Sequence, residues 1–138
     1  MRIMAIDYGD ARTGLAVSDM NGVLAGEAWV ITERNANRVA EAIASEADSR
    51  EVRLIVIGYP KNMDGSAGPR AEKSEELAKL LRTTTDIEVT LWDERMTTMS
   101  ANRILTETGK FGKKRKKTVD AVAASLILES YLLYLSKK

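Results

Sequence analysis

Four carboxylates stand at positions from which they could bind a divalent cation together. Asp7 ends an apolar run near the N-terminus, and Asp93 and Glu94 follow a second apolar run. Asp120 lies at the start of a long apolar stretch. Acids that end neighbouring strands meet at one edge of an α/β sheet, where their like charges favour a cation between them. Because carboxylate oxygen is the ligand that Mg²⁺ and Mn²⁺ prefer, the pattern predicts a site for Mg²⁺ or Mn²⁺ that activates a water molecule.

Two residue types that dominate catalytic and metal sites are absent from the 138-residue chain. The absence of Cys excludes disulfides, thiolate metal sites and cysteine nucleophiles. The absence of His excludes Ser-His-Asp catalysis and zinc bound by imidazole. Any catalysis must therefore depend on carboxylates, other polar side chains, backbone amides or an oxygen-bound metal ion. The length suits a single domain over residues 1–138, and no linker divides it.

Asp120 is in an unusual position for a charge, although a second explanation stays open. Its neighbours one and two helical turns later, Ala123, Ala124 and Ile127, are apolar, as expected of a helix face that packs on a sheet. A carboxylate beside such a face is costly unless it is paired or bound to a metal. However, an acid in the first turn of a helix is also favoured by the helix dipole alone. Asp120 by itself therefore does not establish a site.

The elements that must position these acids alternate between strands and helices. Their order, βββαβαβαα, predicts an α/β fold: a mixed five-stranded sheet, with an antiparallel meander joined to crossover strands and flanked by helices. Asn35 or Asn37 is expected to cap the first helix, and Thr118 the last, which buries Leu133 and Tyr134. The strands are expected at residues 2–7, 13–18, 27–32, 52–58 and 87–92, and the helices at 35–47, 69–82, 97–108 and from 118 onward.

One segment concentrates the positive charge. The net charge is only +1, but six cations lie between Lys110 and Lys117, and the rest of the chain has 15 basic against 20 acidic residues. Such a cluster attracts nucleic-acid phosphates, although a solvated flexible loop is the alternative explanation. Phe111 is the only aromatic residue in the segment, so base stacking has little support. The cations assigned to the nucleic-acid backbone are Lys113, Lys114, Arg115, Lys116 and Lys117.

Two glycine-containing loops could also contact phosphate. Asp7, Gly9 and Gly14 form one of them, in which glycine lets a phosphate approach the backbone. Just beyond the central strand, Asn62 and Arg70 offer an amide and a guanidinium group to phosphate oxygens. Ordinary turns explain both loops as well. The Asp-x-Gly pattern also opens actin-like kinases and ATPases, but one 138-residue domain cannot supply their two lobes.

Four motifs together resemble the YqgF (RuvX) family, in order and with compatible spacing over nearly the whole chain. The resemblance implies an RNase H-like fold related to Holliday junction resolvases, and a nuclease that processes the 5′ end of pre-16S rRNA. It also implies that Asp7, Glu94 and Asp120 form the acidic site. Strand alternation lets only one of Asp93 and Glu94 face that site, and we take Glu94. The motifs are Asp7-Tyr-Gly-Asp-Ala-Arg-Thr-Gly-Leu-Ala-Val-Ser-Asp19, Gly58-Tyr-Pro-Lys-Asn-Met-Asp-Gly-Ser66 with Gly68-Pro-Arg70, Asp93-Glu-Arg-Met-Thr-Thr98 and Lys116-Lys-Thr-Val-Asp-Ala-Val-Ala-Ala124.

The leading hypothesis is a metal-dependent endonuclease that hydrolyses phosphodiester bonds in structured RNA. The nucleic-acid backbone would be held by Arg12, Asn62, Arg70 and the cationic segment. One rival is a Holliday junction resolvase on branched DNA, and another is a non-catalytic RNA-binding factor in ribosome assembly. The sequence does not decide between a monomer and a homodimer. No apolar run approaches the roughly 20 residues of a membrane span, and an acid follows soon after the start, so we expect a cytoplasmic protein with no membrane partner.

Overall fold

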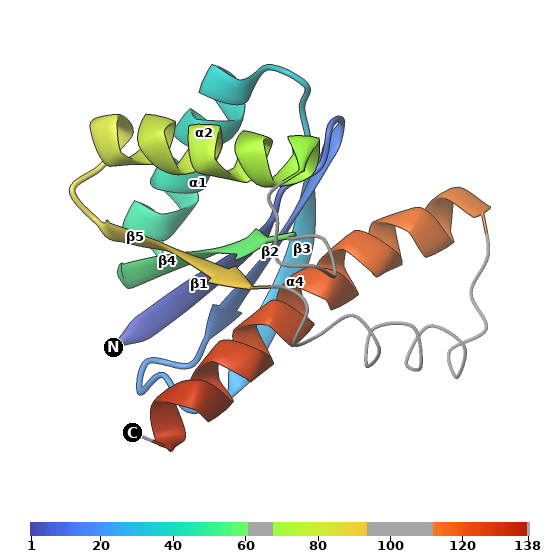
Figure 1. Cartoon of the computed structure of the whole chain (residues 1–138). Helices are drawn as coiled ribbons and strands as arrows, with labels where there is room; N and C mark the ends of the chain where they lie inside the picture. Colours follow the sequence, from blue (N-terminus) through green and yellow to red (C-terminus); the bar gives the residue numbers. More distant parts are fainter. Residues whose placement is uncertain (61–67, 94–111, 138) are drawn as a thin grey trace.

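A mixed sheet of five strands forms the centre of the structure (Figure 1). The strands are β1 (Arg2–Asp7), β2 (Arg12–Ser18), β3 (Ala25–Thr32), β4 (Val52–Tyr59) and β5 (Glu88–Asp93). The computed structural model describes residues 1–60, 68–93 and 112–137, with the backbone alone at 112–118. The strand order is β3-β2-β1-β4-β5. The pairs β3–β2 and β2–β1 are antiparallel, and the pairs β1–β4 and β4–β5 are parallel. The predicted meander with crossover strands is confirmed.

Three helices lie within the described ranges: α1 (Ala36–Ser49), α2 (Pro69–Thr84) and α4 (Gly112–Ser136). The Asn35 side chain accepts a hydrogen bond from the backbone N–H of Arg38, so Asn35, one of the two predicted candidates, is the N-cap of α1. Pro69 begins α2, where its missing N–H would have had no partner within the helix. The helix predicted at 97–108 lies outside the described residues.

The last helix begins earlier than predicted. α4 starts at Gly112 and not after a cap at Thr118, so residues 113–117 form its first turns instead of a loop. Lys and Arg are good helix formers, and a run of them can therefore extend a helix. The correction places the cationic segment on the same helix as Asp120. Figure 1 shows that these first turns extend beyond the end of the sheet.

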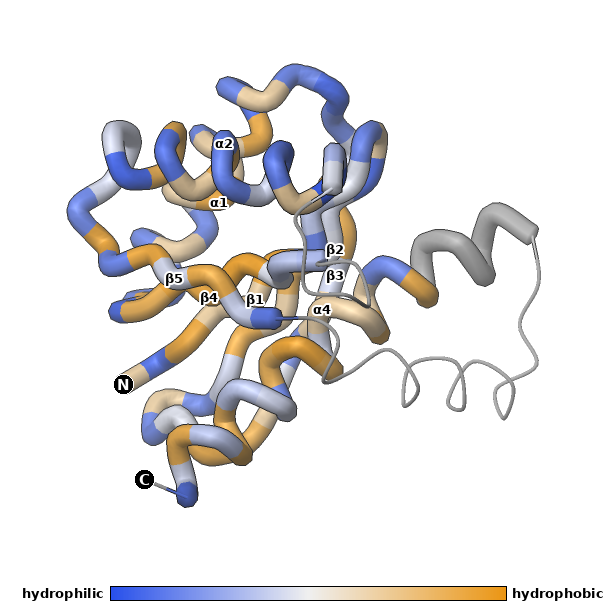
Figure 2. Tube along the Cα trace, viewed as in Figure 1, coloured by the Kyte–Doolittle hydropathy of each residue, from blue (hydrophilic) through white to orange (hydrophobic). Residues whose placement is uncertain are grey.

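The two faces of the sheet bury separate cores. α1 and α2 pack on one face, whose buried residues include Met4 and Ile6 of β1. α4 packs on the opposite face, whose buried residues include Ile3 and Ala5. Figure 2 shows the apolar residues concentrated in the strands and along α4. Successive side chains of a strand point to opposite faces, so Asp7, which continues the series of Ile3 and Ala5, belongs to the α4 face.

The C-terminal half of α4 is less covered than predicted. Ala124 and Ile127 are buried against the sheet, but Leu133 and Tyr134, expected in the core, are 57% and 41% exposed. Contrary to expectation, one helical segment, Val119–Ser136, is long and apolar enough to cross a membrane by length and composition. One side of this segment packs into the core of the sheet, and with 28% of the segment buried that packing explains part of its apolar composition.

Candidate metal and nucleic-acid site

The β1–β2 pair and the start of α4 bring Asp7 and Asp120 to one place. Asp7 pairs with Gly14 in the antiparallel register of β1 and β2. Gly14 in turn lies against α4, because a Cβ atom at this position would be 2.1 Å from the carbonyl oxygen of Asp120. A residue with a side chain could not allow so close an approach of helix and strand. Two acids from opposite ends of the chain therefore meet through one glycine on the α4 face.

The two glycines of the first motif have different structural reasons, and only the turn at Gly9 was suggested by the sequence. Gly9 lies in the β1–β2 turn, where a Cβ atom would be 2.3 Å from the carbonyl oxygen of Arg12. Gly14 lies beneath α4, as described above. The turn and the helix contact thus account for both glycines without a bound phosphate.

Asp120 is held by Arg12 of β2. The Arg12 Nε donates to Asp120 Oδ2 at 3.2 Å, and the Asp120 side chain is 24% exposed. Burial raises the pKa of Asp120, while the hydrogen bond from Arg12 and the charges of Arg12 and Arg70 act in the opposite direction. A partly buried carboxylate that already requires a cation beside it is well suited to bind a metal ion.

The residues predicted to contact phosphate are placed in different ways. Arg12 pairs with Asp120, and Arg70, exposed in the first turn of α2, acts on Asp120 through its charge. Asn62 lies outside the described residues. The cations of the predicted segment lie in the first turns of α4, N-terminal to Asp120; they are Lys113, Lys114, Arg115, Lys116 and Lys117.

Asp93 belongs to the opposite face of the sheet. It pairs with Tyr59 in the parallel register of β4 and β5, and it lines a pocket together with Tyr59 and Glu75 of α2. The Tyr59 hydroxyl donates a hydrogen bond to the Glu75 carboxylate. Because α2 and α4 cover different faces, Asp93 does not join the acids on the α4 face.

The donor set suits a hard divalent cation. Within residues 1–60, 68–93 and 112–137, no three acids gather closely enough to form a metal site by themselves. Asp7 and Asp120 supply two carboxylates, and Glu94, the third predicted ligand, lies outside these ranges. Carboxylate oxygens without thiolate or imidazole fit Mg²⁺ or Mn²⁺.

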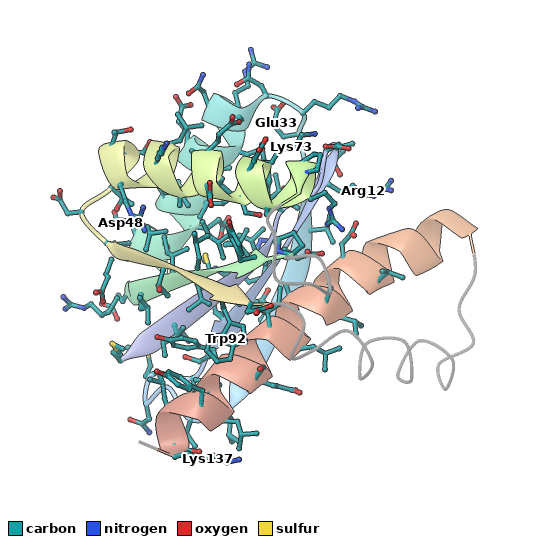
Figure 3. The ribbon with its side chains drawn as sticks, in the orientation of Figure 1. Arg12, Glu33, Asp48, Lys73, Trp92 and Lys137 are labelled. Carbon is teal, nitrogen blue, oxygen red and sulfur yellow. The ribbon has the colours of Figure 1, made fainter. Side chains whose placement is uncertain are left out.

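Two charged residues at this end of the sheet were missed by sequence reasoning. Asp10, in the β1–β2 turn, forms an ion pair with Lys73 of α2. Figure 3 shows Lys73, Arg12 and Glu33 at the same end of the molecule. The two partners are 63 positions apart, so no local pattern connects them. The only available signal was the spacing of Lys73 three residues after Arg70, which places both on one side of a helix.

Two solved structures resemble the whole chain in fold. One is RuvC from Thermus thermophilus in complex with a Holliday junction substrate, with a TM-score of 0.64 and 11% identity over 100% of this chain and 97% of that one. The other is the fowlpox virus resolvase in complex with Holliday junction DNA, with a TM-score of 0.61 and 13% identity over 98% and 99% of the two chains. The fold is therefore the RNase H-like fold of the resolvases, as predicted.

Sequence similarity is more specific than the fold. A family model described as "RuvX: Holliday junction resolvase" matches residues 1–134, and the chain belongs to this RuvX (YqgF) family. A protein of Halothermothrix orenii is 47% identical over 137 residues, which cover 99% of this chain and 98% of that protein. A protein of Desulfitobacterium hafniense is 44% identical over 138 residues, which cover 100% and 96%. Both relatives are named "putative pre-16S rRNA nuclease".

Proposed function

We propose that this chain is a metal-dependent endonuclease that processes the 5′ end of pre-16S rRNA. The observation that carries the proposal is the meeting of Asp7 and Asp120 through Gly14, beside the cationic start of α4. The name shared by the relatives supports the RNA substrate, and the resolvase-like fold supports hydrolysis of phosphodiester bonds. In this proposal, residues 1–138 act as one nuclease domain in the cytoplasm.

Asp7, Glu94 and Asp120 would hold Mg²⁺ or Mn²⁺ in this nuclease. The bound cation supplies an activated water and offsets the charge that develops on the leaving oxygen. Arg12 would leave Asp120 when that carboxylate binds the cation, and its guanidinium group would then hold a phosphate oxygen of the substrate. Arg70, whose charge already acts on Asp120, would hold a neighbouring phosphate.

The start of α4 would orient the substrate by charge and shape. Residues 113–117 precede Asp120 on one continuous helix, so phosphates bound to these cations lie at a fixed distance from the acid. Contacts to phosphate fix the position of a nucleic acid but carry no base information. Selectivity would therefore come from the folded shape of the RNA, and binding should weaken steeply as salt rises.

Branched DNA is a second candidate substrate, supported by the two solved resolvases in complex with Holliday junctions. Cutting a junction at two symmetric positions requires a homodimer with two sites. Removing the end of an RNA requires one site, and a monomer would suffice. Sedimentation of the chain with and without each nucleic acid separates these two proposals.

A non-catalytic role in ribosome assembly is the third possibility. Such a factor would keep the cationic start of α4 but would not need Asp7 and Asp120. It predicts RNA binding that is sensitive to salt and independent of divalent cations. The partly buried carboxylate of Asp120, held by Arg12, favours the nuclease, because a binding factor has no use for that charge.

A cleavage panel tests the proposal. The purified chain is incubated with a pre-16S RNA that carries its 5′ leader and, separately, with a four-way DNA junction, in Mg²⁺, in Mn²⁺ or in excess EDTA. We expect cleavage of the RNA in either metal and none in EDTA. Asp120→Asn should abolish cleavage, and Asp48→Asn, an exposed acid of α1, should not. Cleavage of the junction alone would favour the resolvase, and binding without cleavage would favour the assembly factor.

A further inference from the structure

Four exposed cations gather around the β1–β2 turn, apart from the cationic start of α4. Arg34 and Arg38 come from the β3–α1 connection and the first turn of α1, and Arg70 and Lys73 come from the start of α2. All four residues are exposed. We call these four residues the basic rim.

Backbone and ion-pair contacts hold the basic rim in place around the turn. Lys73 forms an ion pair with Asp10 in the turn itself. The backbone N–H of Glu33 donates to the carbonyl oxygen of Ala11 at 2.9 Å, which ties the β3–α1 connection to the same turn. Arg38 Nη1 lies 3.9 Å from Glu33 Oε1. The β1–β2 turn is thus flanked by the starts of two helices, each of which supplies cations.

The basic rim is continuous with the acid site. The hydrogen bond and charge of Lys73, opposed by desolvation and supported by the charges of Arg70 and Arg34, lower the pKa of Asp10, so the charges of three rim cations act on one carboxylate. The charge of Arg70 also acts on Asp120. Arg70 therefore connects the acid site to the rest of the basic rim.

Surface ion pairs alone do not explain this arrangement. Exposed ion pairs contribute little to stability. Within the described residues, Asp10 and Glu33 form ion pairs with rim cations, Glu72 and Glu76 also lie on α2 near Lys73, and no acid there forms an ion pair with Arg34 or Arg70. The guanidinium groups of Arg34 and Arg70 are consequently exposed beside the site with no ion pair to another described residue.

We propose that the basic rim binds the phosphate backbone of the strand that leaves the acid site over the β1–β2 turn, toward the start of α1. The inference rests on the proposed nuclease function and adds a second basic surface to it. The start of α4 would hold one side of the substrate and the basic rim the other, so that the phosphate to be cleaved lies between them. Figure 3 shows Lys73 and Arg12 together at this end.

Binding measurements test the basic rim without cleavage. In an Asp7→Asn background, fluorescence anisotropy follows a labelled RNA from the 5′ end of pre-16S rRNA over a range of salt concentrations. We expect Arg34→Ala/Lys73→Ala to weaken binding about tenfold and to reduce the slope of log affinity against log salt by about 1 to 2. The control, Arg53→Ala/Lys79→Ala, removes two exposed cations from the start of β4 and the middle of α2 and should change neither quantity.

Removing an acid from the same turn should strengthen RNA binding, which gives a second test of the basic rim. Asp10→Asn removes the carboxylate that neutralises Lys73, and Asp10 is exposed, so the fold should not suffer. We expect this variant to bind the same RNA about threefold more tightly. The single variant Lys73→Ala should weaken binding by a similar factor.

The outcomes separate the basic rim from the nuclease proposal. If the Asp7→Asn parent binds the RNA and Arg34→Ala/Lys73→Ala changes neither the affinity nor the salt slope, the RNA-binding role of the basic rim is overturned. The proposed nuclease function is then unaffected. An equal loss in the control pair would show a general charge effect and would also overturn the rim. Failure of both the unsubstituted chain and the parent to bind the RNA would overturn both proposals. Circular dichroism of each variant verifies that it is folded.

Discussion

Both ends of the central sheet carry acids, yet their surroundings differ. At the site end, Asp120 is partly buried, lies against Gly14 and pairs with Arg12. At the other end, exposed acids that include Asp48 and Asp86 line an open pocket of about 650 Å³. Figure 3 shows Asp48 well away from Arg12.

The difference shows that acids of the same type can have very different surroundings, and the proposed metal site depends on those surroundings and not on acidic composition. Exposed carboxylates are solvated by water and gain little from a partner. A partly buried carboxylate is destabilised unless a cation lies beside it, and a close backbone contact fixes where that carboxylate stands. Matched substitutions at the two ends therefore separate the effect of position from the effect of charge.

The largest difference between the two ends should be in catalysis. Asp7→Asn removes a carboxylate of the proposed metal site, and we expect it to reduce the single-turnover cleavage rate of pre-16S RNA by roughly 1,000-fold or more, with RNA binding retained. Asp86→Asn makes the same change at the opposite end and should leave the rate unchanged. Full activity of the Asp7→Asn variant would remove the acid site from the mechanism.

Packing should give the next largest difference. At Gly14 a Cβ atom would be 2.1 Å from the Asp120 carbonyl oxygen, whereas at Gly26, near the opposite end on β3, it would be 3.1 Å from the Val17 carbonyl oxygen. We expect Gly14→Ala to lower the free energy of unfolding by about 3 kcal/mol in urea titrations, because α4 must shift. Gly26→Ala should cost less than about 1 kcal/mol. Equal costs would contradict the close contact between β2 and α4.

The two arginines Arg12 and Arg53 should differ in their effect on metal binding. Removal of the Arg12 guanidinium leaves Asp120 without its competing cation, so Arg12→Ala should bind Mn²⁺ about threefold more tightly in calorimetry. The same variant should bind RNA about threefold more weakly, because the phosphate contact proposed for Arg12 would be lost. Arg53→Ala, at the opposite end, should change neither affinity. Weaker Mn²⁺ binding by Arg12→Ala would show that Arg12 orients Asp120 for the cation and does not compete with it.

The smallest expected effect lies in the β2–β3 turn at the opposite end. Asp19 Oδ1 accepts the backbone N–H of Val23 at 2.8 Å and that of Leu24 at 3.3 Å. The bond from Val23 is the largest cause of the lowered pKa of Asp19. An acid whose pKa is lowered by folding adds stability above its unfolded pKa and loses it as pH falls through the folded pKa.

Asp19→Ala should therefore lower the thermal midpoint by a few °C at neutral pH, and the difference should disappear in acid. Cleavage should be unaffected, because the turn is remote from the acids. A loss of midpoint that persists unchanged below the folded pKa would show that the hydrogen bonds from Val23 and Leu24 do not depend on the charge of Asp19.

Most of the fold could be predicted because apolar periodicity and turn residues act locally. The run at 52–58 predicts a central strand, and Asn35 predicts a helix start, and both are confirmed. The predicted start of α4 was wrong because cationic residues suit both a loop and a helix, and because the Thr118 side chain suggested an N-cap. The prediction that Leu133 and Tyr134 are buried was wrong, because the helical period does not reveal where the sheet beneath a helix ends.

Less of the site could be predicted, because tertiary contacts define it. The sequence indicates Asp7 and Asp120, but the role of Gly14 depends on how closely α4 approaches β2. Alternation along β5 allows one of two consecutive acids to face the site, and the register of Asp93 with Tyr59 assigns Asp93 to the other face. Neither the contact of Gly14 with α4 nor the pairing of Asp93 with Tyr59 can be predicted from the neighbouring residues in the sequence.

Mn²⁺ binding to matched acid variants tests the central claim most directly. The claim is that Asp7 and Asp120 on the α4 face, with Glu94 as the proposed third ligand, hold the cation, and that Asp93 on the α2 face does not. In isothermal titration calorimetry, we expect the unsubstituted chain and Asp93→Asn to bind Mn²⁺ with similar affinity, and Glu94→Gln and Asp120→Asn to bind at least about tenfold more weakly. Loss of binding in Asp93→Asn together with full affinity in Glu94→Gln or Asp120→Asn would contradict the account.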